Sequence, residues 1–248
     1  MFSKSTVKYI QSLQHKKFRD ESGAFIAEGP KVVAELLETG VFNCQSVFAL
    51  EEWGDALTPS ARKDLGEKLV IIKDFELEKI SALSKPNLVL AVFEKKITNK
   101  ISFNGRLTLA LDDIQDPGNL GTIIRIADWF GVRDIICSLH TADMYNPKVV
   151  QSTMASLARV NLVYVDIAQQ LSSTTVKKYA AALDGTALEK VDKLEEGIII
   201  IGNESKGIRP EIMQLANKKI TISRVGLAES LNAAVATGII LYQLSNKN

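Results

Sequence analysis

Three short stretches of the sequence combine turn residues with side chains that can bind an anion or move a proton. They span residues 116–121, 202–207 and 226–232. The candidate residues in and beside them are two amides, a carboxylate, a hydroxyl and a guanidinium, at Asn119, Asn232, Glu204, Ser230 and Arg125. An amide accepts and donates at once, a carboxylate takes up a proton, and a guanidinium binds an anion through two parallel bonds. Taken singly, each stretch is at least as well explained as an ordinary turn with a helix cap.

Several common enzyme classes are excluded by the same residues. The spacing of Gly202 and Gly207 matches the first half of a phosphate-binding P-loop, but Ile208-Arg209 stands where that motif needs lysine and a hydroxyl residue. The sequence has no GxGxxG. Its two histidines, His15 and His140, are not beside a GxSxG elbow, so a serine hydrolase triad has no base. ATP chemistry and hydrolysis are therefore not expected.

The cysteines and the hydropathy pattern indicate the compartment. Cys44 and Cys137 are far apart and form no CxxC pair, so we expect neither a disulfide framework nor a metal site. Residues 1–19 are polar and lack the apolar core of a signal peptide. No stretch of about 18 apolar residues is present to span a bilayer. These features predict a cytoplasmic protein with no membrane contact.

The stretch 197–202 predicts the centre of the fold. Four consecutive isoleucines between two glycines are typical of a strand buried on both faces of a parallel sheet. The loop after it then leaves the carboxyl end of a strand. Ligands bind at this edge of open α/β sheets, because loops diverge there and helix N-termini present unpaired N–H groups.

The rest of the sequence alternates between expected strands and helices, which predicts an α/β fold with a parallel sheet covered on both faces. We expect a small α/β domain with its linker over 1–100 and a second domain over 101–248, and the linker itself spans 94–106. The expected helices are 6–13, 31–38, 59–66, 75–82, one from about 118 to 131, 147–158, 174–179, one from 210, and 231–244. The expected strands are 24–28, 46–50, 69–72, 88–93, 107–111, 134–137, 161–165, 180–183, 197–202 and 219–222.

The charge of the sequence indicates little about its binding partners, except in the first 19 residues. The sequence has 30 basic and 29 acidic residues, so its overall charge does not indicate a polyanionic partner. Five basic residues precede the first acidic one: Lys4, Lys8, Lys16, Lys17 and Arg19. They form either a basic arm that contacts phosphates or, as is commoner, a solvated helix face.

The three stretches also occur in a fixed order as longer motifs. The first is DPGNLGTIIRIADWFG over 116–131, the second is IGNESKG over 201–207, and the third is ITI at 220–222 followed by ESLN at 229–232. This combination resembles the SpoU (TrmH-like) family of RNA ribose 2′-O-methyltransferases, within the SPOUT superfamily. The likeness covers 107–244. It extends to the start, where 16–19 and 25–31 are similar to the family's ribosomal-protein-like RNA-binding domain.

The resemblance implies a fold, a cofactor and partners. The fold is a parallel sheet whose C-terminal segment threads a loop to make a trefoil knot, and the chain is a homodimer. S-adenosylmethionine is bound by backbone groups of the knot loops, which here are Gly202, Ile222 and Leu231, and no metal is required. RNA is the substrate rather than DNA, because the ribose 2′-hydroxyl is the acceptor and distinguishes the two.

The resemblance also assigns roles to the polar residues. Asn119 and Asn232 are suited to positioning the hydroxyl, and Ser230 completes the polar set. The proton acceptor stays open between two residues. Arg125 is the one to which the family points, although a guanidinium is better suited to holding a phosphate. Glu204 is the ordinary base, although its family role is also explained by support of the knot.

Four positions depart from the usual family pattern. Asp116 replaces an asparagine, Ile126 replaces a threonine, Ser223 replaces a proline, and Ala155 replaces the glycine of a Ser-x-Gly. These changes bear on the geometry of the pocket and on the RNA selected. Two alternatives remain open: a catalytically silent RNA-binding protein of the same fold, and a transfer-RNA 2′-O-methyltransferase. The expected N-terminal domain favours ribosomal RNA over transfer RNA.

Overall fold

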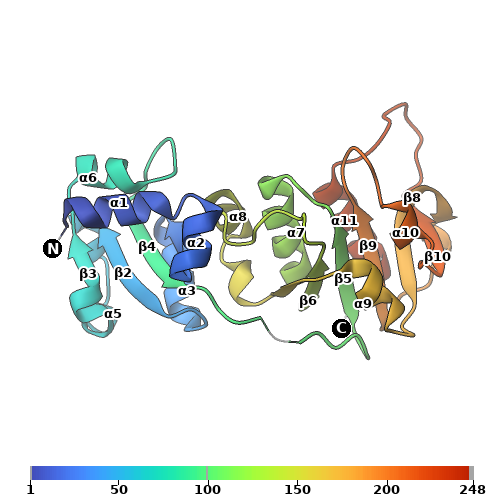
Figure 1. Cartoon of the computed structure of the whole chain (residues 1–248), viewed down its shortest axis with the longest axis horizontal. Helices are drawn as coiled ribbons and strands as arrows, with labels where there is room; N and C mark the ends of the chain where they lie inside the picture. The colour runs from blue at the N-terminus through green and yellow to red at the C-terminus, as the bar shows by residue number, and fades with distance from the viewer. Residues whose placement is uncertain (1, 99, 246–248) are drawn as a thin grey trace. The chain divides into compact units, whose positions relative to one another are not determined.

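The structure is a computed structural model that describes residues 2–98 and 100–245 (Figure 1). They divide into two compact units, one of residues 2–97 with Tyr145–Ala158 and one of Thr98–Met144 with residues 159–245. The segment Tyr145–Ala158 thus groups with the first unit, although it lies outside the range 1–100. The linker expected over 94–106 includes Asn99, which is outside the described residues. Its other positions after Glu94 are neither helix nor strand.

The first unit is built on a mixed sheet. In the described part of the chain its four strands are β1 (Ala24–Glu28), β2 (Cys44–Ala49), β3 (Leu69–Ile71) and β4 (Val89–Glu94), in the order β1-β4-β2-β3. β4 runs antiparallel to β1 and to β2, and β2 runs parallel to β3. The alternation of helices and strands did not predict this mixture, because it does not fix the direction in which the last strand enters a sheet.

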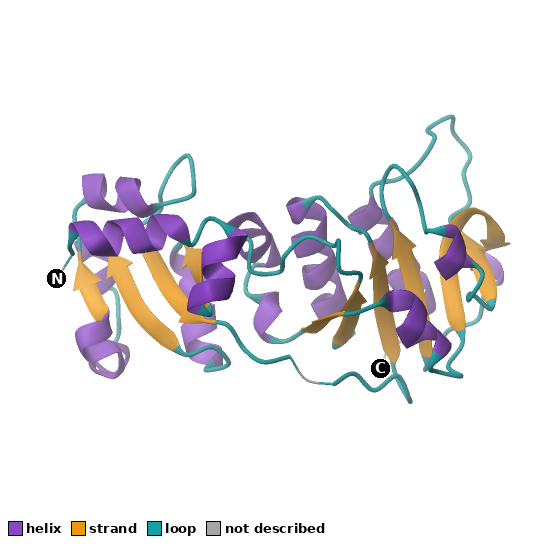
Figure 2. Ribbon diagram, viewed as in Figure 1, coloured by secondary structure: helices purple, strands orange, loops and turns teal. Residues whose placement is uncertain are grey.

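Helices surround this sheet, as Figure 2 shows. They are α1 (Lys4–Ser12), α2 (Lys16–Ser22), α3 (Pro30–Thr39), α4 (Glu51–Asp55), α5 (Pro59–Leu65), α6 (Asp74–Ile80) and α8 (Pro147–Thr153), with 3-10 turns η1 (Gly66–Lys68) and η2 (Ser156–Ala158). Ile10 of α1 and Ile80 of α6 pack against Ile26 and Leu90 of the sheet, and all four are buried. Burial of these apolar faces holds the helices against the strands.

The second unit contains a parallel sheet. Among the described residues its six strands are β5 (Leu107–Asp112), β6 (Asp134–Cys137), β7 (Asn161–Tyr164), β8 (Lys178–Ala187), β9 (Gly197–Gly202) and β10 (Lys218–Thr221), in the order β10-β8-β9-β5-β6-β7. Every neighbouring pair is parallel. The chain proceeds from β5 to one side through β6 and β7, and β8, β9 and β10 lie on the other side. The strand order therefore reverses between β5 and β9, where a binding crevice is expected.

Helices lie on both faces of this second sheet. They are α7 (Pro117–Trp129), α9 (Ile167–Ser172), α10 (Pro210–Met213) and α11 (Ala233–Leu244), with the 3-10 turn η3 (Leu188–Lys190). Ile198 and Ile200 pack with Ile167 of α9 and Ile212 of α10. Since successive strand residues face opposite ways, Ile199 and Ile201 point to the other face, and they are equally buried. The prediction of a strand buried on both faces at 197–202 is confirmed.

Two helix predictions are wrong. The helix expected over 174–179 is absent from the described residues there: α9 lies earlier, at Ile167–Ser172, and Lys178 already begins β8. Asp166 caps α9 by accepting from Gln169 N, a start signal that the apolar spacing did not reveal. The helix expected over 147–158 stops at Thr153, because Met154 and Ala155 take left-handed conformations. The short helices α2 and α4 were not predicted.

Membrane and metal sites can be assessed only within 2–98 and 100–245. None of the helices there has both the length and the apolar composition needed to cross a bilayer. In the same residues, His, Cys, Asp and Glu side chains form no group of three or more that could ligate a metal.

The left-handed Ala155 yields a stability prediction. Its φ is +68° and its side chain is fully buried. Left-handed backbone costs an L-residue about 1–2 kcal/mol, whereas a buried methyl group contributes about 0.8 kcal/mol. We expect Ala155→Gly to raise the free energy of unfolding slightly, by up to about 1 kcal/mol, in urea denaturation. Ala158→Gly, in the adjacent η2, is the matched control and should destabilise. A lower free energy of unfolding for Ala155→Gly would show that the left-handed backbone at Ala155 is not strained.

Candidate active site

The three polar stretches lie at one edge of the second sheet. The first follows β5 and leads into α7, the second follows β9, and the third follows β10 and leads into α11. The carboxyl ends of parallel strands share one edge, so the fold brings these loops together although they are distant in sequence.

A chain of hydrogen bonds joins all three stretches. Asn119 Nδ2 donates to Glu204 Oε1 at 2.6 Å, and Asn232 Nδ2 donates to Asn119 Oδ1 at 2.8 Å. Asn232 Oδ1 in turn accepts from Ala234 N at 2.9 Å and from Val235 N at 3.2 Å. We name Glu204, Asn119 and Asn232 the amide relay. Three of the five polar candidates are thus in direct contact.

The donor and acceptor atoms of the amide relay can be assigned in only one way. An ionised carboxylate only accepts, so Asn119 must turn its Nδ2 toward Glu204 and its Oδ1 toward Asn232. Asn232 must then turn its own Oδ1 to the free N–H groups at the start of α11, where it is the N-cap residue. Asn119 lies in the first turn of α7. Two helix N-termini therefore direct their positive ends, through amides, toward one carboxylate.

The first stretch is held by Asp116. Its side chain caps α7 by accepting from Asn119 N at 2.8 Å, and Pro117 takes the first helical position. Aspartate and asparagine cap helices about equally well. The departure from the family pattern at 116 therefore preserves the turn that presents Asn119.

The second stretch is a tight loop that two glycines permit. Asn203 N donates to Gly207 O and Gly207 N donates back to Asn203 O, at 3.0 and 2.9 Å. A Cβ at Gly202 would lie 2.3 Å from the carbonyl carbon of Gly207, and Gly207 itself has a φ of +68°. Asn203 Oδ1 also accepts from Ser205 N and Lys206 N. The loop is thereby held in one conformation, which fixes the position of Glu204.

Arg125 and Ser230 lie outside the relay in the described structure. Arg125 is exposed on α7, six residues and about 9 Å of helix beyond Asn119. Ser230 is exposed in the loop before α11. The last helix, expected from about residue 231, begins at Ala233 with Asn232 as its N-cap, so Ser230 does not cap it.

The residues expected at the cofactor all belong to the same edge. Gly202 ends β9, Ile222 directly follows β10, and Leu231 precedes α11 with 47% of its surface exposed. Their backbone groups are the ones that the resemblance implies in cofactor binding. Nearby, Ser223 Oγ donates to Glu189 Oε2 at 3.0 Å, so the serine at this position is held by η3.

The remaining departures have structural explanations of their own. Ile126 packs toward α11, where a Cβ on Gly238 would lie 3.6 Å from Ile126 Cδ1. Ala155 lies in the left-handed turn after α8, in the first unit.

Cys137 also lies at the active edge, at the end of β6, and is fully buried. Burial raises the pKa of its thiol, and burial raises the pKa of the Cys44 thiol to about 11. Both therefore stay protonated near neutral pH and are poor nucleophiles. The two thiols are therefore not candidates for a nucleophile.

The sequence motifs did not single out Asp112, Asp113 and Arg209. Asp113 O accepts from Asn203 of the second stretch, and the Asp112 carboxylate accepts from Arg209, just after that stretch. Arg209 entered the sequence analysis only as a residue that does not fit a P-loop. An acidic pair at the end of a buried strand was the available signal, because a carboxylate there needs a partner.

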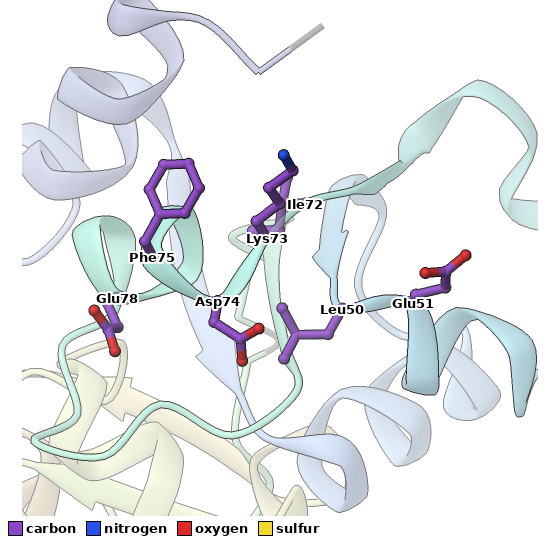
Figure 3. A pocket seen from close by; sticks show the side chains of 7 residues that line it. All are labelled: Leu50, Glu51, Ile72, Lys73, Asp74, Phe75 and Glu78. Atoms are coloured by element: carbon purple, nitrogen blue, oxygen red, sulfur yellow. The ribbon is translucent and has the colours of Figure 1, made fainter.

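The first unit offers two hollows of opposite charge. One, of about 510 Å³, is lined by Leu50, Glu51, Ile72, Lys73, Asp74, Phe75 and Glu78 (Figure 3). Its three carboxylates against one lysine disfavour a phosphate. The other, of about 410 Å³, lies between α1 and α6 and is lined by Phe2, Ser3, Lys4, Val7, Lys8, Gln11, Glu76 and Lys79. Its three lysines against one glutamate favour an anion.

Comparison with known proteins agrees with this geometry. Residues 106–242 match the model of the SpoU rRNA methylase family, and residues 4–91 match the MRM3-like substrate binding domain. The 23S rRNA (guanosine(2553)-2′-O)-methyltransferase RlmP of Bacillus subtilis is 30% identical over 96% of this chain and 95% of its own length.

Solved structures agree as well. A protein described as a TrmH-family RNA methyltransferase candidate, from Porphyromonas gingivalis, superimposes with a TM-score of 0.86 at 34% identity, over 99% of this chain and 98% of that one. An AdoMet-bound rRNA methyltransferase from Sinorhizobium meliloti superimposes with a TM-score of 0.85 at 30% identity, over 97% and 94% of the two chains. The fold and the three motifs define a SPOUT-type methyltransferase. The chain belongs to the SpoU rRNA methylase family, and the resemblance seen in the sequence is confirmed.

Proposed function

We propose that this protein transfers a methyl group from S-adenosylmethionine to a ribose 2′-hydroxyl of ribosomal RNA in the cytoplasm. The observation that carries the proposal is the amide relay, which joins the three family motifs at the carboxyl edge of a parallel sheet. The relatives support the substrate and the cofactor, since one is named for 2′-O-methylation of 23S rRNA and another was solved with AdoMet bound.

The cofactor would be held by main-chain groups at Gly202, Ile222 and Leu231. A glycine at 202 is needed for the tight loop to close, because a Cβ there would lie 2.3 Å from the carbonyl carbon of Gly207 and 2.4 Å from Ile208 N. S-adenosylmethionine supplies an electrophilic methyl group on a sulfonium. The family resemblance further implies that the C-terminal segment threads a loop to make a trefoil knot, and chain tracing in an experimental density map would test that threading.

The chain's own residues would position the hydroxyl and help its proton leave. The ribose hydroxyl must lose its proton as its oxygen takes the methyl group, in line with the departing sulfur. Asn119 keeps one free lone pair on Oδ1, with which it can accept from the hydroxyl. Both lone pairs of Asn232 Oδ1 are taken by Ala234 N and Val235 N, so Asn232 positions the hydroxyl by orienting Asn119. Because the relay fixes both amides beforehand, positioning contributes much of the rate, up to about 7–11 kcal/mol in favourable cases.

Arg125 and Glu204, the two charged candidates, would have different roles. Arg125 is exposed and free of the relay, which suits it to hold the phosphate beside the target ribose. Glu204 Oε1 is occupied by Asn119, so Glu204 anchors the relay, and its second oxygen is the remaining acceptor for a proton. Ser230 is exposed beside Leu231 and is available to the RNA.

The RNA would dock on the first unit through the basic hollow between α1 and α6. Lys4, Lys8 and Lys79 line it, and Gln11 Nε2 donates to Lys79 O at 2.7 Å, which ties the two helices together. Of the basic residues considered as an arm, Arg19 is not available. It is buried, and its Nη1 donates to Leu13 O and Gln14 O. The start of the chain is therefore two helices rather than an arm.

A second copy of the chain would cover the outer face of α11. Val235, Ile239 and Tyr242 are 51%, 38% and 57% exposed and recur at helical spacing, so they form one apolar stripe. Val225 and Leu227, in the loop before α11, are also fully exposed. Exposed apolar surface of this kind marks an interface, which supports the homodimer implied by the family.

The alternatives are less well supported. A catalytically silent RNA-binding protein has no use for a relay that links three loops, and here the relay is complete. A transfer-RNA substrate is disfavoured because the 23S rRNA enzyme matches nearly the whole chain, including the first unit.

Arg125→Ala tests the reaction. We expect it to lower methyl transfer at least about 100-fold, because the phosphate loses its charged partner. Transfer of tritiated methyl groups to ribosomal RNA measures this, with S-adenosylmethionine affinity from calorimetry unchanged. Arg133→Ala, an exposed arginine at the opposite edge of the sheet, is the control. Full activity of Arg125→Ala would remove Arg125 from the site, and a wild type that neither binds the cofactor nor transfers methyl would refute the function.

Lys4→Glu with Lys8→Glu tests the RNA surface. The double variant should weaken RNA binding and reduce the slope of log affinity against log salt by about 2, with the rate at saturating RNA unchanged. Filter binding at several salt concentrations measures it. Lys63→Glu with Lys68→Glu, on and next to α5, makes the same charge change elsewhere on the unit and should have less effect. Equal effects of the two pairs would argue against a specific surface.

Ile239→Glu with Tyr242→Glu tests the dimer. Sedimentation of the wild type should give twice the chain mass of 27.2 kDa, and the double variant should give a monomer, because two charges would be buried in the interface. Leu183→Glu, at an apolar position on β8 that is 76% exposed, is the control and should remain dimeric. A monomeric wild type at micromolar concentration would exclude the dimer.

A further inference from the structure

Two consecutive aspartates at the end of β5 hold the loop that carries Glu204. Asp112 is fully buried and pairs in register with Gly202, the residue at which the loop begins. Its carboxylate accepts from Arg209 N and from Arg209 Nε, both at 2.8 Å. The main-chain oxygen of Asp113 accepts from Asn203 Nδ2 at 2.8 Å. The loop 203–209 is therefore attached at its first and last residues to one dipeptide.

Further contacts hold both ends of this attachment in place. Asp113 has a φ of +58°, and its N–H donates to Ser138 Oγ, which in turn donates to Asp113 Oδ1. Ser138 directly follows β6, so β5 and β6 share this anchor. At the other end, Ile208 is buried against the sheet beside Arg209. Between the two attachments, Glu204 is the residue that meets the amide relay.

We propose that Asp112 and Arg209 are positioning residues for methyl transfer, acting through Glu204. This rests on the function proposed above. The buried carboxylate needs a partner, and the two bonds from Arg209 meet that need only when the loop closes at the observed register. A closed loop places Glu204 Oε1 within 2.6 Å of Asn119 Nδ2 and so orients both amides. Without the pair, the loop keeps its glycine turn but loses its attachment to β5.

The sheet contains a matched pair that separates positioning from general stability. At the opposite edge, Arg106 Nη1 contacts Asp134 Oδ2 at 3.2 Å, and Asp134 is also buried. Asp134 additionally accepts from Asn161 Nδ2 at 3.0 Å. Loss of either arginine leaves a buried aspartate short of a partner, but only Arg209 is attached to the relay's loop.

The experiment is a double-mutant cycle on the full chain, using Arg209→Ala, Glu204→Ala and the two combined, with Arg106→Ala as control. The first measurement is amide hydrogen exchange in 203–207. We expect Arg209→Ala to speed it about tenfold while β9 stays protected, and Arg106→Ala to leave it unchanged. The second is the single-turnover rate of methyl transfer to ribosomal RNA, which should fall about 100-fold in Arg209→Ala, with little change in RNA affinity.

The double-mutant cycle shows whether Arg209 affects the rate of methyl transfer through Glu204 or by another route. In the Glu204→Ala background, Arg209→Ala should change the rate less than about twofold, because the residue through which it acts is gone. Arg209→Lys, which keeps one donor for Asp112, should restore part of the rate, and it replaces Arg209→Ala in the cycle if that variant does not fold. Unchanged loop exchange, or rate losses that multiply in the double variant, would overturn the proposal. If the wild type transfers no methyl group, the proposed function fails, and hydrogen exchange alone then decides whether the pair holds the loop.

Discussion

The hydrogen bond between Asn119 Nδ2 and Glu204 Oε1 is the contact on which the site depends. It spans 85 positions of sequence, and the next bond, from Asn232 to Asn119, spans 113. Each bond fixes the orientation of the next amide, because a carboxylate only accepts and an amide that donates at one end must accept at the other. One negative charge therefore determines how two side chains from other loops are presented.

The order and register of the strands bring the loops of Asn119 and Glu204 close enough for this hydrogen bond. β5 and β9 are adjacent and parallel, with Asp112 in register with Gly202, so the loops after them leave side by side. The strand order reverses between these strands, which opens the edge to a ligand. α7 and α11 both begin at this edge, and their N-termini favour a carboxylate nearby. Topology, helix dipoles and the amide relay thus act in the same direction.

Much of the site can be predicted from the sequence, because its residues are local signals. The run of isoleucines at 198–201 predicts the central strand, Pro117 and Gly131 bound α7, and Gly202 and Gly207 bound the tight loop. The wrong predictions arise where a local signal is weak or overridden. Apolar spacing continues through Ala155, but a left-handed turn ends α8 at Thr153.

By itself the sequence determined that the protein is α/β, that a strand buried on both faces precedes the Glu204 loop, and that three ordered motifs carry the polar residues. Tertiary structure decided which of those residues touch: Asn119, Glu204 and Asn232 do, and Arg125 and Ser230 stand apart from them in the described residues. It also decided the partnership of Asp112 with Arg209 and the burial of Arg19. The physical reason is that propensity and periodicity act over a few residues, whereas a hydrogen bond between loops depends on strand order and register, which only the packed sheet specifies.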